Sequence, residues 1–438
     1  MALSLAVWAL IGTRVSADPI SARAASDALT RHRAVSGVPS VDGDVEVGAS
    51  AHAAYLARNV GRPEVAGLRV HEEDPSLPGA TPEGAAAAKR SHVASGDQSA
   101  ASMIDGLIGA PLHRHALLDP RLEWIGLGRA GSGTRIDPYQ WVVDLSSADR
   151  PWIGPAVAVA YPGPGQMQVP TRFADGETPD PRAAVAGPAG AINGMGYPIT
   201  LSFFGCRPTA TTARLTAVGT ALPDGTVASI ADSDVPIYLL TPGTTIRTDT
   251  GDRDVEPVLF FAREVLRPQT VYRATVSATC GSLGTNTYEW TFATRPRLRP
   301  EDVAVAVGAP ASGGVQEVVL VADAGGVAVP ARVSEVQASF TIQGSRTGST
   351  PAVGGAPEID LDEGRADSDG RMRLRVNLRG ATSADVTAMV TDDGISIPVM
   401  FTVRPVASGA TKVVVPATAP FPRLQNWRPS WVTAPDGG

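Results

Sequence analysis

Helical periodicity in this sequence is confined to the first third of the chain, and short alternating strands follow it. Glycine and proline, at 46 and 37 of 438 residues, favour many turns and short strands over long helices. A chain of this length exceeds a single hydrophobic core and suits two to four domains. The sequence therefore predicts a small mixed domain followed by all-β modules.

Helical spacing of apolar residues occurs in three segments, at residues 20–36, at 51–60 and in a stripe at 103–108. A glycine follows each of the first two segments, which is a common helix stop. Ser95 or Asp97 is a candidate cap for the third. Strands are expected at 122–127 and 139–145, so helices come first and antiparallel strands after, as in a layered α/β domain.

The remainder of the chain has the rhythm of β-sandwiches. Residues 148–190 are dense in proline and glycine and are predicted to form a linker and the first strand of the next module. We expect one sandwich over 155–296 and another over 302–406, followed by a tail at 407–438 that contains proline and tryptophan. The phrase from Leu266 to Tyr272 resembles the tyrosine corner of fibronectin-type and immunoglobulin-like sandwiches.

Several features favour export from the cell. An apolar run ends at Gly12, and Val15-Ser16-Ala17 gives the small-x-small pattern of a signal peptide over residues 1–17; a buried N-terminal helix is the alternative. The run is too short to span a bilayer, and no other segment is apolar enough. An exported chain permits a disulfide between Cys206 and Cys280, worth up to about 4 kcal/mol, although two free buried thiols are the alternative.

The net charge of −7 gives no basic surface for nucleic acid, so nucleic acid is not an expected partner. We therefore expect a secreted protein or one at the cell envelope, without a transmembrane segment beyond the signal peptide.

An ordered set of phrases in the first domain is similar to a bacterial CAP domain, the superfamily of cysteine-rich secretory proteins, antigen five and plant pathogenesis-related proteins. The phrases are Ala28–Gly37, Ala51–Ala57, His71–Asp74, Ala110–Arg114, Leu117–Gly128 and Gln140–Asp144. The resemblance covers residues 20–147 and implies an α-β-α sandwich. The whole chain is then multidomain, with a CAP-like domain followed by two all-β immunoglobulin-like sandwiches.

The same resemblance implies a cavity with two histidines, His71 and His113. The family's Gly-Glu-Asn phrase is replaced here by residues 90–96, so we expect Glu83 to supply the lost carboxylate from a neighbouring loop. Neutral imidazoles are common zinc ligands, so His71 and His113 could bind zinc or another divalent metal weakly, or form a hydrogen-bonded pair that binds nothing. His32 and His115 are expected at the surface, beside arginines.

Three functions remain open at this point. The leading one is a non-enzymatic extracellular binding protein whose ligand is a lipid, a sterol or a cell-envelope component. The first alternative is a metal-dependent hydrolase using the His71/His113 cavity. The second is a structural surface protein with a degenerate CAP domain, which the lost carboxylate and Leu107, in place of the family's tryptophan, favour. No catalytic residue is assigned.

Overall fold

The computed structural model of the chain describes residues 17–96, 99–132, 137–173, 176–186, 194–222, 225–281, 284–299, 302–307, 315–323, 331–342, 345–347, 358–363, 371–378, 383–392 and 395–404. The expected signal peptide, apart from Ala17, and the expected tail at 407–438 lie outside these residues.

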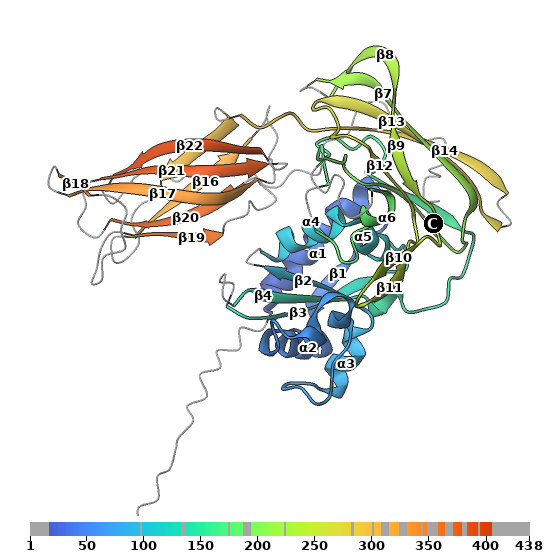
Figure 1. Ribbon diagram of the computed structural model, residues 1–438, viewed down its shortest axis with the longest axis horizontal. Coiled ribbons are helices and arrows are strands. Elements are labelled where there is room, and N and C mark those ends of the chain that lie inside the picture. The colour runs from blue at the N-terminus through green and yellow to red at the C-terminus, as the bar shows by residue number, and fades with distance from the viewer. Residues whose placement is uncertain are drawn as a thin grey trace, which may run out of the picture.

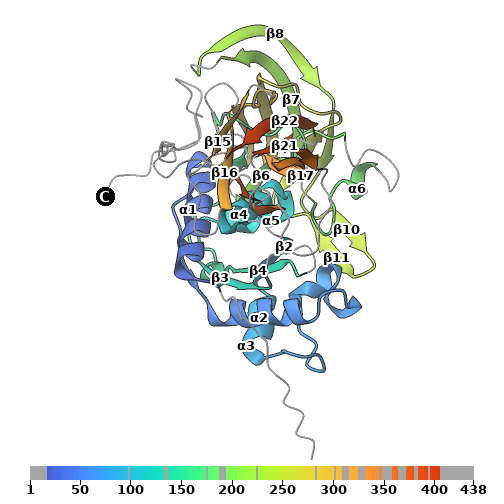
Figure 2. The ribbon, with the colours of Figure 1, turned by 90° about the vertical axis from the view of Figure 1, so that its left-hand side faces the viewer.

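The N-terminal domain has three layers, with helices on both faces of one four-stranded sheet (Figure 2). The sheet order is β1-β3-β4-β2; β1 and β3 are parallel, and the other pairs are antiparallel. The helices are α1 (Pro19–Val35), α2 (Val47–Arg58), α3 (Pro82–Ala88), α4 (Ala100–Gly109) and α5 (Pro111–Leu117), and the strands are β1 (Asp42–Val45), β2 (Ser91–Gly96), β3 (Trp124–Ala130) and β4 (Tyr139–Asp144).

Alternation along β4 explains the three layers. Trp141 and Val143 pack into a core with α1 and α4, whereas Val142 packs with α2 on the opposite face. The helix ends follow their local sequence: the Asp18 side chain accepts from the Ser21 backbone N–H at 2.7 Å, and α1 is followed by Gly37 at φ 72°. Ser99, not the expected Ser95 or Asp97, caps α4.

A β-rich region follows, as expected, and its first part is built from two four-stranded sheets and a separate hairpin. The sheets have the orders β5-β6-β12-β9 and β14-β13-β7-β8, and β10 pairs with β11. The elements are β5 (Val157–Tyr161), α6 (Ala183–Ala186), β6 (Ile199–Phe204), β7 (Thr209–Ala221), β8 (Val227–Val235), β9 (Ile237–Leu240), β10 (Thr245–Thr248), β11 (Gly251–Asp254), β12 (Val258–Ala262), β13 (Thr270–Thr279) and β14 (Thr285–Ala293). The predicted disulfide between Cys206 and Cys280 is present and confirmed.

The second part of this region again contains two four-stranded sheets, drawn apart from the rest at the left of Figure 1. Their orders are β15-β16-β20-β19 and β18-β17-β21-β22, and one hydrophobic core takes residues from both sheets. The strands are β15 (Val303–Val307), β16 (Val315–Ala322), β17 (Arg332–Ile342), β18 (Ser345–Thr347), β19 (Glu358–Glu363), β20 (Arg371–Asn377), β21 (Ser383–Asp392) and β22 (Ile395–Val403).

The N-terminal domain and the first β part share one continuous core, which the sequence pattern does not predict. That core runs from α1 and α4 through β5 and β6 to β13 and β14. The buried guanidinium of Arg114, on α5, lies 4.5 Å from the centre of the Tyr161 ring and donates to the Pro198 carbonyl oxygen at 2.8 Å. Side chains from the two parts therefore fill the same interior.

Candidate functional site

A cavity of about 510 Å³ lies beside β2, the edge strand of the N-terminal sheet. Its residues come from both helical layers, from β2 and β4, and from the segment at 176–178, which lies between β5 and α6 of the first β part. The apolar lining residues are Leu56, Val60, Val65, Val70, Val93, Ala94, Met103, Leu107 and Ala110, and the polar ones are His71, Ser95, His113, Gln140, Glu177 and Thr178. The cavity is therefore mixed: apolar side chains outnumber polar ones, but polar atoms form the larger part of its exposed wall.

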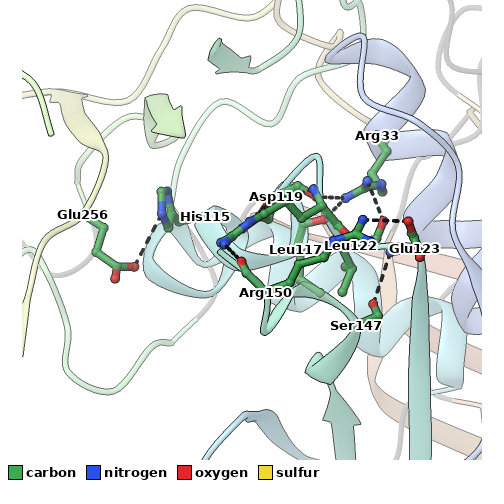
Figure 3. Close-up of polar contacts among 10 residues, drawn as sticks. Arg33, His115, Leu117, Asp119, Leu122, Glu123, Ser147, Arg150 and Glu256 are labelled. Atoms are coloured by element: carbon green, nitrogen blue, oxygen red, sulfur yellow. Dashed lines mark hydrogen bonds and ion pairs between the residues drawn. The ribbon is translucent and has the colours of Figure 1, made fainter. Parts of the chain in front are cut away.

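Arg33 fixes the C-terminal end of α5, the helix that carries His113. Its guanidinium donates to the carbonyl oxygens of Leu117, Asp119 and Leu122, at 2.7, 3.0 and 3.1 Å (Figure 3). The first of these bonds satisfies a carbonyl group that the end of α5 leaves unpaired, and the other two hold the loop that follows the helix. Burial lowers the pKa of Arg33 to about 10, so the side chain remains charged at neutral pH.

His113 and the N-terminus of α5 are held by a carboxylate from outside the N-terminal domain. Oε1 of Glu177 accepts from the backbone N–H groups of Leu112 and His113, at 2.8 and 2.9 Å, and from Nδ1 of His113 at 2.8 Å. The Glu177 side chain is fully buried. A carboxylate in this position satisfies unpaired donors of the helix and complements its dipole, a role for which Ala110 at the N-cap has no polar side chain.

His71 ends the 3₁₀ helix η2 (Gly67–His71) and lines the same cavity. Its pKa is lowered from 6.5 to about 4, mainly by burial; the nearby His113 and Arg253 contribute to the decrease, and a hydrogen bond to the Ala88 backbone opposes it. His71 is therefore neutral at pH 7.

His92, on β2, lies directly beneath His113. Its Nε2 donates to the His113 carbonyl oxygen at 2.9 Å, and the two rings meet edge to face with centroids 4.7 Å apart. Burial holds the pKa of His92 well below its usual value, and His113 and Arg253 add to this effect. His92 supports the backbone of the cavity histidine and does not itself line the cavity.

Glu83, the expected carboxylate, is exposed in the first turn of α3 and is not one of the cavity residues. The Thr81 hydroxyl caps that helix by accepting from the Gly84 N–H at 3.0 Å. Glu83, two residues after the cap, is exposed to solvent. Glu177 occupies the place beside His113 instead. Sequence reasoning missed it because it lies 64 residues beyond His113, in a stretch whose prolines indicate only a loop.

The other histidines pack against neighbouring parts of the fold; His32 and His52 are buried and His115 is partly buried. His52 bonds Glu73 through Nδ1 at 3.0 Å, and both side chains are buried. His32 and His115 are not surface residues as expected. His32 bonds the hydroxyl of Tyr161 and the carboxylate of Asp105, each at 2.8 Å.

His115 stacks on Phe204 with ring centroids 4.9 Å apart, and Glu256 lies 3.7 Å from its Nε2 (Figure 3). Both expectations failed because the first β part covers the surface on which these histidines would otherwise lie.

The two cavity histidines do not make a sufficient metal site. Among the described residues, no group of three or more histidine, cysteine, aspartate or glutamate side chains is placed to hold a metal ion. Catalytic zinc sites use three protein ligands. The donor set formed by His71 and His113 therefore does not fit a resident zinc ion.

The three-layer domain and its histidine-lined cavity define a CAP-like domain at the head of a β-rich chain. Residues 27–145 match the model of the cysteine-rich secretory protein family, CAP, which confirms the resemblance found in the sequence. This chain is a CAP-domain protein with C-terminal β modules.

A search of curated proteins finds no match. Among solved structures, the chain is similar to the adhesin InvE of Yersinia pseudotuberculosis at 14% identity and a TM-score of 0.21, covering 56% of this chain and 58% of that one. The chain therefore spans little more than half the length of that adhesin.

Proposed function

We propose that this chain is an exported bacterial CAP-domain protein that binds a lipid, a sterol or another apolar envelope component in its CAP cavity without transforming it. The cavity carries the proposal, because about 510 Å³ lies within the size range of small-molecule pockets and because apolar side chains line it together with a few polar groups. His71 is neutral at pH 7, so its ring adds no charge against an apolar ligand.

The β modules are proposed to be immunoglobulin-like spacers or adhesive surfaces. Two facing four-stranded sheets in each part support this, as does the backbone N–H of Arg267, which donates to the Tyr272 hydroxyl at 2.7 Å as in a tyrosine corner. The Cys206–Cys280 disulfide fits an oxidising compartment. Within the described residues, no helix has the length and apolarity needed to cross a membrane.

The test is ligand-dependent stabilisation of the full chain. Lipids, sterols and cell-wall fragments are titrated, and a ligand at 100 times its Kd should stabilise the protein by about 2.7 kcal/mol and raise the melting temperature. Val93→Phe places a ring in the cavity from a strand position that suits it, and should abolish the shift. Val227→Phe, at an exposed strand position far from the cavity, should leave the shift intact.

Unchanged melting temperatures across all three ligand classes would defeat the binding proposal and favour a structural surface protein with a degenerate CAP domain. The metal-dependent hydrolase has no comparable support, because it requires a third ligand beside His71 and His113.

A further inference from the structure

Strand β8 is an edge strand that lies open to solvent. It is the last strand in the sheet order β14-β13-β7-β8, and among the described strands it neighbours β7 alone. It lies at the upper rim of the molecule in both views (Figures 1 and 2). Every residue of the strand except Val235 is exposed, so both of its faces are accessible. A sheet edge presents unpaired N–H and C=O groups, which a further strand can pair with.

Two other edge strands of the first β part are covered along their outer side. The segment at 163–169 lies along β14, where the Gly165 backbone N–H donates to the Thr291 carbonyl oxygen at 2.7 Å. The hydroxyl of Ser36, which follows α1, donates to the Ala160 carbonyl oxygen of β5 at 2.9 Å. The exposure of β8 is therefore a property of this strand and not of every sheet edge in the fold.

The charges that usually protect an exposed edge are neutralised in β8. Its two acidic residues, Asp232 and Asp234, form ion pairs with Arg273 and Arg214 of the same sheet. The preceding half of the strand, residues 227–231, contains neither a charged residue nor a proline. Its two large apolar side chains, at positions 227 and 230, are 40% and 41% exposed. This half therefore has the composition of a strand that pairs with another.

The backbone groups of this half point alternately toward β7 and away from it. The Leu222 N–H donates to the Thr226 carbonyl oxygen at 2.9 Å, so the first pair beside the turn is hydrogen-bonded. Pairs in an antiparallel ladder alternate, so Ala228 bonds to β7, whereas Val227 and Ser229 lie in pairs without hydrogen bonds. The N–H and C=O groups of Val227 and Ser229 therefore point outward, toward the free edge.

A second copy of this chain suits that edge because its own β8 presents the same two outward residues. With a twofold axis at Ala228, Val227 of each copy faces Ser229 of the other, and the two residues can exchange both N–H···O=C bonds. The remaining facing residues are uncharged, because Ala228 meets its own counterpart and Ile230 meets Thr226. This arrangement places no like charges opposite each other within residues 226–230.

We propose that β8 is a self-association site, at which two copies of the chain pair their β8 strands in antiparallel orientation about a twofold axis at Ala228. The two four-stranded sheets then form one continuous sheet. A twofold axis uses the free edge of both copies, so the assembly closes as a dimer. The site shares no residue with the cavity, so this association is independent of the proposed ligand binding.

Sedimentation velocity of the full chain tests the association over a series from about 1 μM to about 100 μM. The wild type should pass from monomer to dimer as the concentration rises. Ser229→Pro removes an outward N–H group without removing a bond to β7, so it should weaken dimerisation at least about tenfold. Near-ultraviolet circular dichroism checks that this variant is folded. A monomeric wild type at every concentration would overturn the proposal, as would assemblies that grow beyond the dimer.

Cysteine cross-linking tests the position of the axis. In Ala228→Cys, the two facing Cα atoms belong to a pair without hydrogen bonds and lie about 4.5 Å apart, which allows a disulfide. Mild oxidation should give a covalent dimer, and adding Ser229→Pro should abolish it. Thr287→Cys, at an exposed position on β14, should stay monomeric. Absence of the Ala228→Cys dimer, or equal cross-linking of both cysteine variants, would overturn the twofold pairing of β8.

Discussion

Two buried carboxylates hold histidines in the N-terminal domain, and they differ in how their oxygens are used. Glu73 bonds His52 with Oε1 and the backbone N–H of Thr81, at 2.8 Å, with Oε2. Glu177 gathers three N–H groups on one oxygen. The first arrangement ties η2 and α3 to α2, and the second ties a later segment to the cavity.

Replacing Glu73 with alanine should destabilise the chain by about 3 kcal/mol, because it leaves a buried histidine and a buried N–H unpaired. Urea unfolding followed by near-ultraviolet circular dichroism measures the change. Glu64→Ala, at an exposed position, should change the free energy of unfolding by less than about 0.5 kcal/mol. Equal effects of the two substitutions would contradict the importance of the buried pair.

His71 should make stability depend on pH in acid. Its folded pKa of about 4 lies below the unfolded value of 6.5, so the unfolded chain binds more protons between these values. The contribution of His71 is fully present above pH 6.5, is lost as pH falls toward 4, and amounts to at most about 3 kcal/mol.

His71→Gln should therefore lose less stability than the wild type between about pH 7 and about pH 4.5, as urea unfolding at both values would measure. Identical losses in the two proteins would contradict the lowered pKa of His71.

The limits of sequence reasoning at this scale follow from distance along the chain. His71 and His113 could be proposed because each sits in a local phrase that resembles the CAP family. Glu177 could not, because nothing local distinguishes a carboxylate that reaches a helix 64 residues earlier from one in a solvated loop. Glu83 is the carboxylate that the sequence suggests, because it lies between the two histidines in the chain. In the structure it occupies an exposed position in the first turn of α3.

Among the elements, the hairpin β10–β11 connects the β region to the wall of the cavity. The Leu68 backbone N–H, in η2, donates to Oγ1 of Thr250 at the turn of the hairpin, at 3.0 Å. Gly67, at φ 59°, lets the two segments approach, since a Cβ there would lie 2.2 Å from Thr250 Oγ1. The segment that carries His71 is thus braced from outside its own domain.

Thr250→Val keeps the side-chain shape and removes this acceptor, so the amide of Leu68 should exchange about tenfold faster with solvent deuterium. Hydrogen exchange with peptide-level mass spectrometry measures the rate. Thr285→Val removes an exposed hydrogen bond between Thr285 on β14 and Thr279 on β13. It should leave the exchange rates of residues 67–71 unchanged. An unaltered exchange rate for Leu68 in Thr250→Val would show that the hairpin does not hold η2.

Element prediction succeeded where spacing and stop signals agreed, as in α1, α2 and α4. It missed β1 and β2, because β1 has only four residues and β2 contains polar residues that face the neighbouring helices or solvent. The hairpin β10–β11 was also missed, since its strands have four residues each, are mostly polar and exposed, and bury the side chain of Ile246. Its place over η2 depends on tertiary contacts that sequence periodicity does not encode.

At the scale of the molecule, the cores do not follow the three modules expected from the sequence. The CAP domain and the first β part share one hydrophobic core, and the second β part has its own. The buried ion pair between Arg295 and Asp392 joins the second part to the first. Two cooperative units, rather than three, are therefore expected on unfolding.

Calorimetry of the full chain should resolve two transitions, and two substitutions should move them separately. Arg114→Lys removes the planar donor group that spans the shared core and leaves the carbonyl oxygens of Ile108 and Pro198 without this donor. It should lower only the melting temperature of the first unit, by about 5 °C. Leu374→Ala creates a cavity in the separate core and should lower only the other transition. If Arg114→Lys instead split the first transition, with the CAP domain melting alone, the shared core would not act as one cooperative unit. The cavity, which Glu177 and the hairpin complete, would then belong to an interface able to open while both parts stay folded.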